Sequence, residues 1–211
     1  MTPVQKHYEI LAATIIKGLE KRNMEGYYFA TSKEAVDYIM SIIPEGSSVS
    51  WGGSATLDQT GMMDALKASS LKKIDRGAAS CPEEKKALER QAFSADYYFM
   101  STKAITTDGE LVNVDGNGNR VASLVYGPDH VMILAGMNKV AMDEESAIKR
   151  VHTAAAPMNT VRLGLNTPCS TTGVCKNCLS PDCVCAHTVI TRYNRLKGRI
   201  KVFLIGETLG F

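Results

Sequence analysis

Apolar residues recur at helical spacing near the start of the chain. Over residues 3–22 they form one stripe, while charged side chains occupy the opposite face. Such a stripe is typical of an amphipathic helix that packs against a core. We therefore predict a helix over about residues 3–22, whose inner face carries Val4, Tyr8, Leu11, Ile15 and Leu19.

Short apolar runs alternate with further helical segments in the next part of the chain. The residues between these runs carry helix signals, such as the capping-box pattern from Thr31 to Glu34 and Pro82 at a helix start. Strands that alternate with helices favour a mainly parallel sheet covered by helices on both faces. The predicted strands cover residues 26–30, 48–51, 71–74, 97–101 and 131–135.

The pattern changes in the last third of the chain. A helix is expected from Asp143, and Pro157 should interrupt it because proline cannot donate a backbone hydrogen bond. Residues 189–193 and 200–205 read as two strands joined by a segment that contains Gly198. Their spacing predicts a hairpin at the C-terminus.

A turn-rich stretch from residue 106 to residue 120 joins two α/β halves. Asp108-Gly109 is a turn signal, a short strand follows, and residues 115–119 form a glycine- and asparagine-rich loop. Asp115 could be a general base or could simply hold this loop through turn hydrogen bonds. Asn119 could orient a ligand or serve as a helix N-cap, and Arg120 could bind a phosphate or carboxylate or form a surface salt bridge.

Two other segments are placed to meet a ligand. Gly52, Gly53 and Ser54 stand between a strand and a helix, where backbone N–H groups could cradle an anion. The alternative is a tight turn with Ser54 as N-cap. Asn138 and Lys139 follow the strand at 131–135, and ligands in open α/β sheets bind outside the carboxyl ends of strands.

Lys139 is our preferred anion contact. Glu110 and Glu207 are acid–base candidates only if they face the same cleft. Together with Asp115 they are the carboxylate candidates, and the sequence leaves open whether the protein is an enzyme. His7, His130 and His152 are read as surface or hydrogen-bonded residues rather than catalytic ones.

Composition is that of an ordinary globular domain. The 211 residues are 45% hydrophobic and 22% charged, which suits a single domain with a sizeable core. The formal net charge is +2 and no long basic run is present, so nucleic acid is not an expected partner. The polar start and the short apolar runs predict a cytoplasmic protein without a membrane segment.

Five of the six cysteines lie close together, with two residues between Cys175 and Cys178. Thiolates at this spacing can chelate one ion, and soft thiolates favour zinc or an iron–sulfur cluster. His187 is a further candidate ligand. The alternatives are a disulfide formed in air or a loop of reduced cysteines, and the isolated Cys81 is a packing residue or helix cap. The candidate metal ligands, in a loop over residues 169–187, are Cys169, Cys175, Cys178, Cys183 and Cys185.

One set of motifs lies at residues 51–54, 96–99, 104–120, 126–128, 136–139, 168–169 and 172–182. Together these motifs resemble the LUD-domain family, the lactate-utilisation protein B/C group. The resemblance implies a three-layer α/β body similar to the sugar-phosphate isomerase and CoA-transferase group. It also implies a part in converting L-lactate to pyruvate within a complex that contains iron–sulfur subunits. It supplies no catalytic residue to carry over.

Three functions follow as hypotheses. The first is a lactate-utilisation-related redox accessory protein with a site for an anionic small molecule. The second is a metal-binding subunit or scaffold of a redox complex that uses the cysteine loop, and the third is a transferase- or ligase-like enzyme for a phosphorylated metabolite or CoA. Other complex subunits or a second copy of the chain are candidate partners. The predicted ligand contacts are Gly52, Gly53, Ser54, Asn119, Arg120, Asn138 and Lys139.

Overall fold

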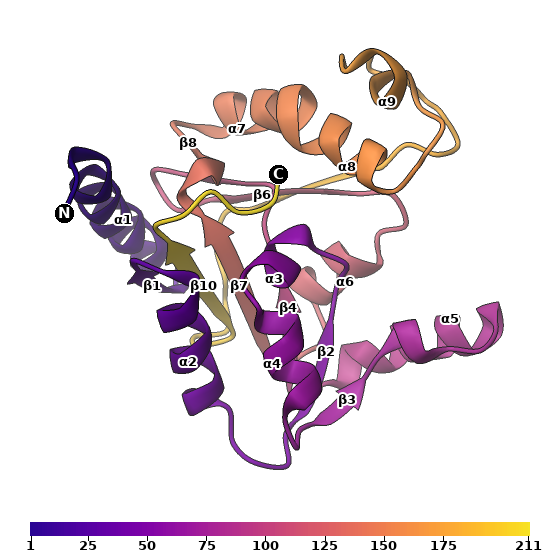
Figure 1. The fold of residues 1–211 in the computed structure, drawn as a ribbon, viewed down its shortest axis with the longest axis horizontal. Helices are drawn as coiled ribbons and strands as arrows, with labels where there is room; N and C mark the ends of the chain where they lie inside the picture. The colour runs from indigo at the N-terminus through magenta and orange to yellow at the C-terminus, as the bar shows by residue number, and fades with distance from the viewer.

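The computed structural model describes residues 1–211, and its centre is a six-stranded sheet (Figure 1). Every neighbouring pair in this sheet is parallel, in the order β1-β10-β7-β4-β2-β3. The predicted parallel sheet is therefore confirmed. Its strands are β1 (Glu25–Phe29), β2 (Ser48–Trp51), β3 (Lys72–Ile74), β4 (Tyr97–Met100), β7 (His130–Gly136) and β10 (Ile200–Ile205).

Helices cover both faces of this sheet. On one face α1 (Pro3–Lys21) and α6 (Asn119–Val125) pack against Val131, Ile133 and Val202. The opposite face is covered by α2 (Ser32–Ile42), α3 (Ala55–Gln59) and α4 (Met62–Ala68), which enclose a second cluster that includes Phe99 and Phe203. Two buried clusters on either side of one sheet make a three-layer α/β fold. The helix α5 (Pro82–Gln91) extends away from this body (Figure 1).

A second, smaller sheet lies above the first in the order β8-β5-β6-β9. Its strands are β5 (Ala104–Thr106), β6 (Leu111–Asp115), β8 (Val140–Ala141) and β9 (His187–Thr191). The predicted C-terminal hairpin is therefore wrong, because β9 pairs antiparallel with β6 while β10 enters the central sheet between β1 and β7. Gly198 does adopt the left-handed backbone expected of a turn, but the connection joins two different sheets.

The helix that follows β8 covers this second sheet. It runs through α7 (Glu144–Arg150), a π-helical segment (Val151–Ala155) and α8 (Ala156–Arg162) without a break. Pro157 was expected to interrupt this helix, but the backbone stays helical through it and only changes to a π-helical turn just before it. The wider π turn places the proline at the start of α8, where its missing N–H is tolerated. This continuity carries α8 to the cleft described below.

Local capping signals are borne out. Thr2 and Thr31 form capping boxes, Cys81 caps α5, and Ser54 accepts the backbone N–H of Leu57 at the start of α3. A further short helix, α9 (Pro168–Thr172), opens the cysteine loop and was not predicted. No helix combines the length and the apolar character that crossing a membrane requires.

Candidate functional site

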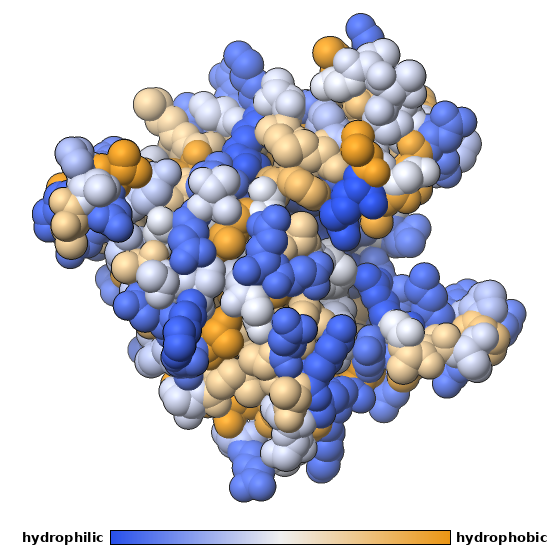
Figure 2. Space-filling model, in the orientation of Figure 1, coloured by the Kyte–Doolittle hydropathy of each residue, from blue (hydrophilic) through white to orange (hydrophobic).

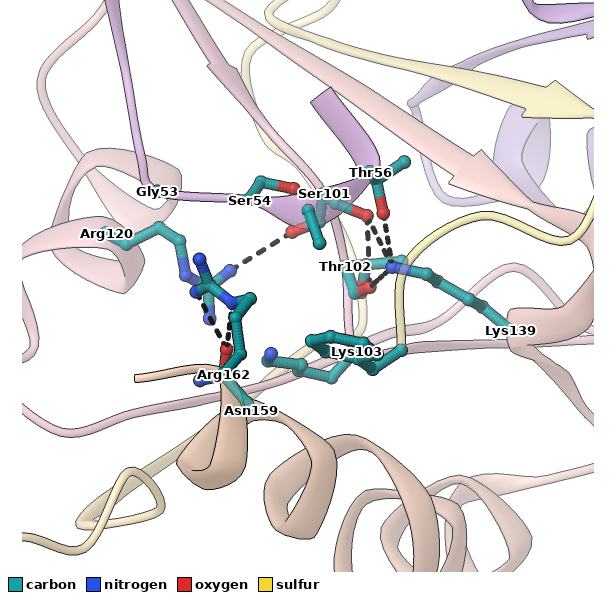
Figure 3. Close-up of a pocket in the computed structure, with 12 residues that line it drawn as sticks. Gly53, Ser54, Thr56, Ser101, Thr102, Lys103, Arg120, Lys139, Asn159 and Arg162 are labelled. Carbon is teal, nitrogen blue, oxygen red and sulfur yellow. Dashed lines mark hydrogen bonds between the residues drawn. The ribbon is translucent and has the colours of Figure 1, made fainter. Parts of the chain in front are cut away.

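A cleft opens where β2, β4 and β7 end, on the side that faces α8 (Figure 3). The cavity itself has a volume of about 30 Å³, and the wider space that includes its open mouth measures about 340 Å³. Figure 2 shows a notch in the molecule between the α8–α9 region and α5, with many hydrophilic side chains around it. The cleft itself has no lining residue from α5, and we call it the basic cleft. It is lined by Gly53, Ser54, Ala55, Thr56, Ser101, Thr102, Lys103, Arg120, Lys139, Asn159, Arg162 and Phe211.

Lys139 reaches the cleft from the short turn that follows β7 and is only 3% exposed. Its Nζ atom donates to the hydroxyl oxygens of Thr56, at 2.8 Å, and Ser101, at 2.9 Å. The Thr102 carbonyl accepts a third bond at 3.3 Å. Burial lowers the pKa of this amine well below its usual range, and the neighbouring Lys103 lowers it further. Lys139 therefore ties the ends of three strands together and polarises two hydroxyls.

Lys103 follows β4 and is half-buried. Its backbone is held on both sides, since its N–H donates to the Val112 carbonyl and its own carbonyl accepts from Arg150 at 2.6 Å. Its amine shares no hydrogen bond with the other residues that Figure 3 draws. Burial lowers the pKa of Lys103 to about 7, and the charges of Arg120 and Arg162 act in the same direction. The amine is therefore available to a ligand.

Arg120 is held from several sides. Its guanidinium donates to the carbonyls of Ser101 and Val114 and to the side chain of Asn113, at 2.6 to 3.1 Å. Its Nε atom lies 3.4 Å from the Asp115 carboxylate. Most of its donors are already engaged, so Arg120 builds the wall of the cleft and adds positive charge to it.

Arg162 and Asn159 come from α8 on the other side of the cleft. The Asn159 side-chain oxygen accepts from Nε and Nη2 of Arg162 at 3.1 and 2.8 Å. The guanidinium is otherwise exposed, and Arg162 forms no salt bridge. Four basic side chains thus line the cleft, and none of the lining side chains is acidic. The arrangement suits an anionic ligand.

The chain matches the LUD domain over residues 12–205. It belongs to the LUD domain family. This match spans the central sheet, both helical layers and the cysteine loop. A comparison with curated proteins gave no match.

One solved structure is similar to this LUD domain over nearly the whole chain, and others are similar over about half of it. A DUF162 family protein from Deinococcus radiodurans has a TM-score of 0.54 and 10% identity, and the similarity covers 94% of this chain and 98% of that one. A D-ribose-5-phosphate isomerase in complex with phospho-erythronic acid is similar over 52% of this chain and 53% of its own, at 12% identity and a TM-score of 0.34. The eIF2B delta protein from Chaetomium thermophilum covers 56% of this chain and 51% of its own, at 16% identity and a TM-score of 0.35.

Some of the predicted ligand contacts of the LUD domain meet in the basic cleft. Gly53, Ser54, Arg120 and Lys139 all line it. Gly52 lies directly behind, where a Cβ atom would come within 2.9 Å of the Arg120 side chain. The absence of a side chain at this position therefore lets Arg120 pack against the β2 end.

Two predicted contacts have other roles. Asn119 donates to Glu89 at 3.0 Å, outside the cleft. It is also not the N-cap of α6, because Gly118 holds that position with a φ of 81°. Asn138 uses its side chain to bind the backbone of Leu209, which anchors the C-terminal segment.

The predicted carboxylates do not line the cleft. Asp115 accepts the backbone N–H groups of Asn117 and Gly118, which is the turn role considered for it. Glu110 pairs with Arg22 at 2.9 Å. Glu207 accepts two hydrogen bonds from Ser32. These contacts supply each carboxylate with a structural role.

Sequence reasoning did not single out several lining residues. Ser101, Thr102 and Lys103 follow β4, so the rule that ligands bind at strand carboxyl ends could have found them. Asn159 and Arg162 had no such signal, because their position depends on α8 continuing past Pro157.

The cysteine loop holds free thiols. Cys169 is buried against Thr160 and Thr167, and Cys175 lies 3.3 Å from Nδ1 of His152. Burial, together with the nearby thiols of Cys183 and Cys175, raises the pKa of Cys185 to about 11. No three His, Cys, Asp or Glu side chains are grouped as a metal ion requires, and His187 lies apart, beside Gly118. Binding of zinc or an iron–sulfur cluster stays a prediction.

Proposed function

We propose that the basic cleft binds a small organic acid, and that its ligands are 2-hydroxy or 2-oxo monocarboxylates of the lactate and pyruvate type. The observation that carries this proposal is the set of four basic side chains around a cleft without an acidic lining side chain. The resemblance to lactate-utilisation proteins supplies the class of acid. Redox chemistry would then belong to partner subunits, and this chain would present the acid.

The cationic groups divide into two kinds. Arg120 and Lys139 are already hydrogen-bonded within the protein, so they contribute charge and rigidity. Lys103 and Arg162 keep free donors and approach the cleft from opposite sides, one after β4 and one on α8. A carboxylate between them would gain charge-assisted hydrogen bonds from both.

The hydroxyls beside Lys139 suit the second functional group of such an acid. Thr56 and Ser101 both accept hydrogen bonds from the Lys139 amine. Ser54 also lines the cleft, next to Thr56. Hydroxyl groups can donate to a ligand oxygen or accept from a ligand hydroxyl, so they fit both a 2-oxo and a 2-hydroxy group.

The size of the cleft bears on the alternative of a CoA-dependent or similar enzyme. The cavity volume of the cleft is only about 30 Å³, which is small for a ligand site. A short monocarboxylate suits this space better than a large cofactor. The cleft therefore favours the small acid over CoA.

Calorimetric titration of L-lactate, pyruvate and phosphate into the purified protein at low salt tests the proposal. We expect saturable one-site binding of the two carboxylates. Lys103→Met and Arg162→Met should each weaken it by about tenfold to a hundredfold, the loss of one charge-assisted hydrogen bond. Lys86→Met, on the exposed outer part of α5, is the matched control and should bind like the wild type.

Phosphate serves as a test of selectivity in the same experiment. If phosphate binds and the two carboxylates do not, the ligand class of the cleft is a phosphate and not a carboxylate. Absence of saturable binding for all three anions would reject the proposed function. Equal affinity in the wild type, Lys103→Met and Arg162→Met would place the bound acid elsewhere.

A further inference from the structure

We propose that the Lys103 amine is a nucleophile that forms an imine with a 2-oxo acid bound in the basic cleft. This inference rests on the proposed function, because it needs the acid to occupy the cleft. It goes further in assigning covalent chemistry to one side chain and in choosing the 2-oxo acid as the reacting ligand.

The position of Lys103 supports this role. Its backbone is fixed by the bonds to Val112 and Arg150, so the side chain starts from a rigid point. Figure 3 shows the amine pointing into the cleft, toward the side where Arg120 and Arg162 lie, without a hydrogen bond to the other residues drawn. Lys139, by contrast, donates three hydrogen bonds and is 3% exposed. Lys103 is therefore the lysine of this cleft whose nitrogen can reach a ligand.

The surroundings of Lys103 favour its neutral, nucleophilic form. Burial is the largest cause that lowers its pKa to about 7, and nearby cations add to it. Roughly half of such amines are neutral near pH 7, against on the order of one in a thousand for an ordinary lysine. A desolvated lysine next to other cations is a known way to activate an amine toward carbonyl groups. The charged groups that act on it are Arg120 on α6, Arg150 on α7, Arg162 on α8, Asp115 on β6 and Lys139 after β7.

The same cations would hold the acid in place for the reaction. Arg162 would bind the carboxylate, which leaves the neighbouring carbonyl carbon beside the Lys103 nitrogen. The nitrogen lone pair forms a C–N bond while the carbonyl π electrons move to oxygen. Both amine protons pass to that oxygen, the C–O bond breaks, and water leaves. The net change is amine plus ketone to imine plus water, with no oxidant or reductant.

Reductive trapping tests the inference. The wild-type protein is incubated with pyruvate and sodium cyanoborohydride near neutral pH, and tryptic peptides are mapped by mass spectrometry. We expect a reduced adduct concentrated on Lys103. Lactate has a hydroxyl group at carbon 2 where pyruvate has a ketone, so it should give no adduct.

Lys103→Arg separates this inference from the proposed function. Arginine keeps the positive charge and the hydrogen-bond donors, but its guanidinium stays protonated and does not form the imine. The variant should lose the adduct even at pyruvate concentrations at which calorimetry shows its cleft to be occupied. Lys86→Met should keep both.

Three outcomes decide the matter. Pyruvate binding with an adduct on Lys103 that Lys103→Arg abolishes supports the inference. Pyruvate binding without an adduct, or with label spread equally over exposed lysines, overturns the inference and leaves the proposed function intact. No pyruvate binding by the wild type rejects the proposed function and the inference with it.

Discussion

The Nζ atom of Lys139 lies 2.8 Å from the hydroxyl oxygen of Thr56, and this bond links the segment after β7 to the start of α3. The two residues are 83 positions apart in the chain. Both are buried, at 3% and 1% exposure. A buried ammonium or amine depends on such partners, because water does not replace them.

Thr56→Val should therefore destabilise the fold. The valine keeps the shape but removes an acceptor from Lys139, and leaving a buried polar group short of a partner costs about 1–3 kcal/mol. Urea unfolding would measure the change. Thr153→Val, at an exposed position of the π-helical segment, is the control and should stay within about 0.5 kcal/mol of the wild type. Equal stabilities of the two variants would contradict the role of this bond.

Arg120 offers a second test of how the cleft is built. Arg120→Met should lower the free energy of unfolding by about 3–5 kcal/mol, because Asp115 and Asn113 would lose their buried cationic partner. Arg162→Met removes another arginine of the same cleft, but an exposed one, and should change stability by less than about 0.5 kcal/mol. Thermal and urea unfolding of both variants would settle which arginine is structural. Similar losses in both would be inconsistent with these roles.

Gly52 and Gly53 should differ although they are adjacent. A Cβ atom at Gly52 would lie 2.9 Å from Cδ of Arg120 and 3.1 Å from the Tyr98 hydroxyl, while one at Gly53 would approach Arg76 only to 3.4 Å. Arg120 is held by its hydrogen bonds and cannot easily move aside. Gly52→Ala should therefore cost about 1–3 kcal/mol, and Gly53→Ala much less. A reversed order in unfolding experiments would show that Arg120 is free to shift.

The pH dependence of stability should carry the signature of Lys103. Its pKa is about 7 in the folded protein, and an unfolded lysine titrates near 10.4. Between these values the unfolded chain binds more protons, so the free energy of unfolding rises with pH, by up to about 1.4 kcal/mol per pH unit. Below about pH 7 Lys103 is protonated in both the folded and the unfolded state. The free energy of unfolding then no longer changes with pH through this group.

Lys103→Met isolates that contribution. Urea unfolding should be measured from about pH 7 to about pH 9. Over this range the free energy of unfolding of the wild type should rise relative to that of the variant. Lys139 titrates in both proteins, but its pKa is lowered less in the variant, which lacks the neighbouring Lys103 charge. If the free energies of unfolding of the two proteins change in parallel with pH, folding does not change the pKa of Lys103.

Metal binding by the cysteine loop is tested separately from the cleft. If the thiols hold zinc or an iron–sulfur cluster, protein prepared without air should carry close to one equivalent of metal ion or cluster, and Cys175→Ser with Cys178→Ser should lose it. Elemental analysis and an absorbance spectrum would measure this. Cys81→Ser is the control, because Cys81 lies at the start of α5, outside the loop. Metal-free, colourless protein whose loop thiols all react would reject metal binding.

Much of the fold could be read from local patterns. The α1 stripe, the Thr31 capping box and the apolar strand runs depend on neighbouring residues, and these elements formed as expected. The pairing of β9 and β10 could not be read in this way. Both strands lie near each other in sequence, but their partners are β6, β1 and β7, which lie far away in the chain.

The cleft likewise combines residues that the sequence indicated with residues that only the tertiary structure places there. Lys139, Ser54 and Arg120 follow strands or open helices, so their placement had a sequence signal. Arg162 and Asn159 reach the cleft only because a π turn carries the helix past Pro157. Turn residues such as Asp115 look like catalytic candidates in a sequence, and only the partners in the structure distinguish the two roles.

A crystal structure of the protein grown with pyruvate tests the central claim most directly, because it shows where the acid lies. We predict a ligand in the basic cleft, with its carboxylate between the Arg162 guanidinium and the Lys103 amine and its 2-oxo oxygen near the Thr56 and Ser101 hydroxyls. An empty cleft at saturating pyruvate, or an acid bound outside it, would contradict the account.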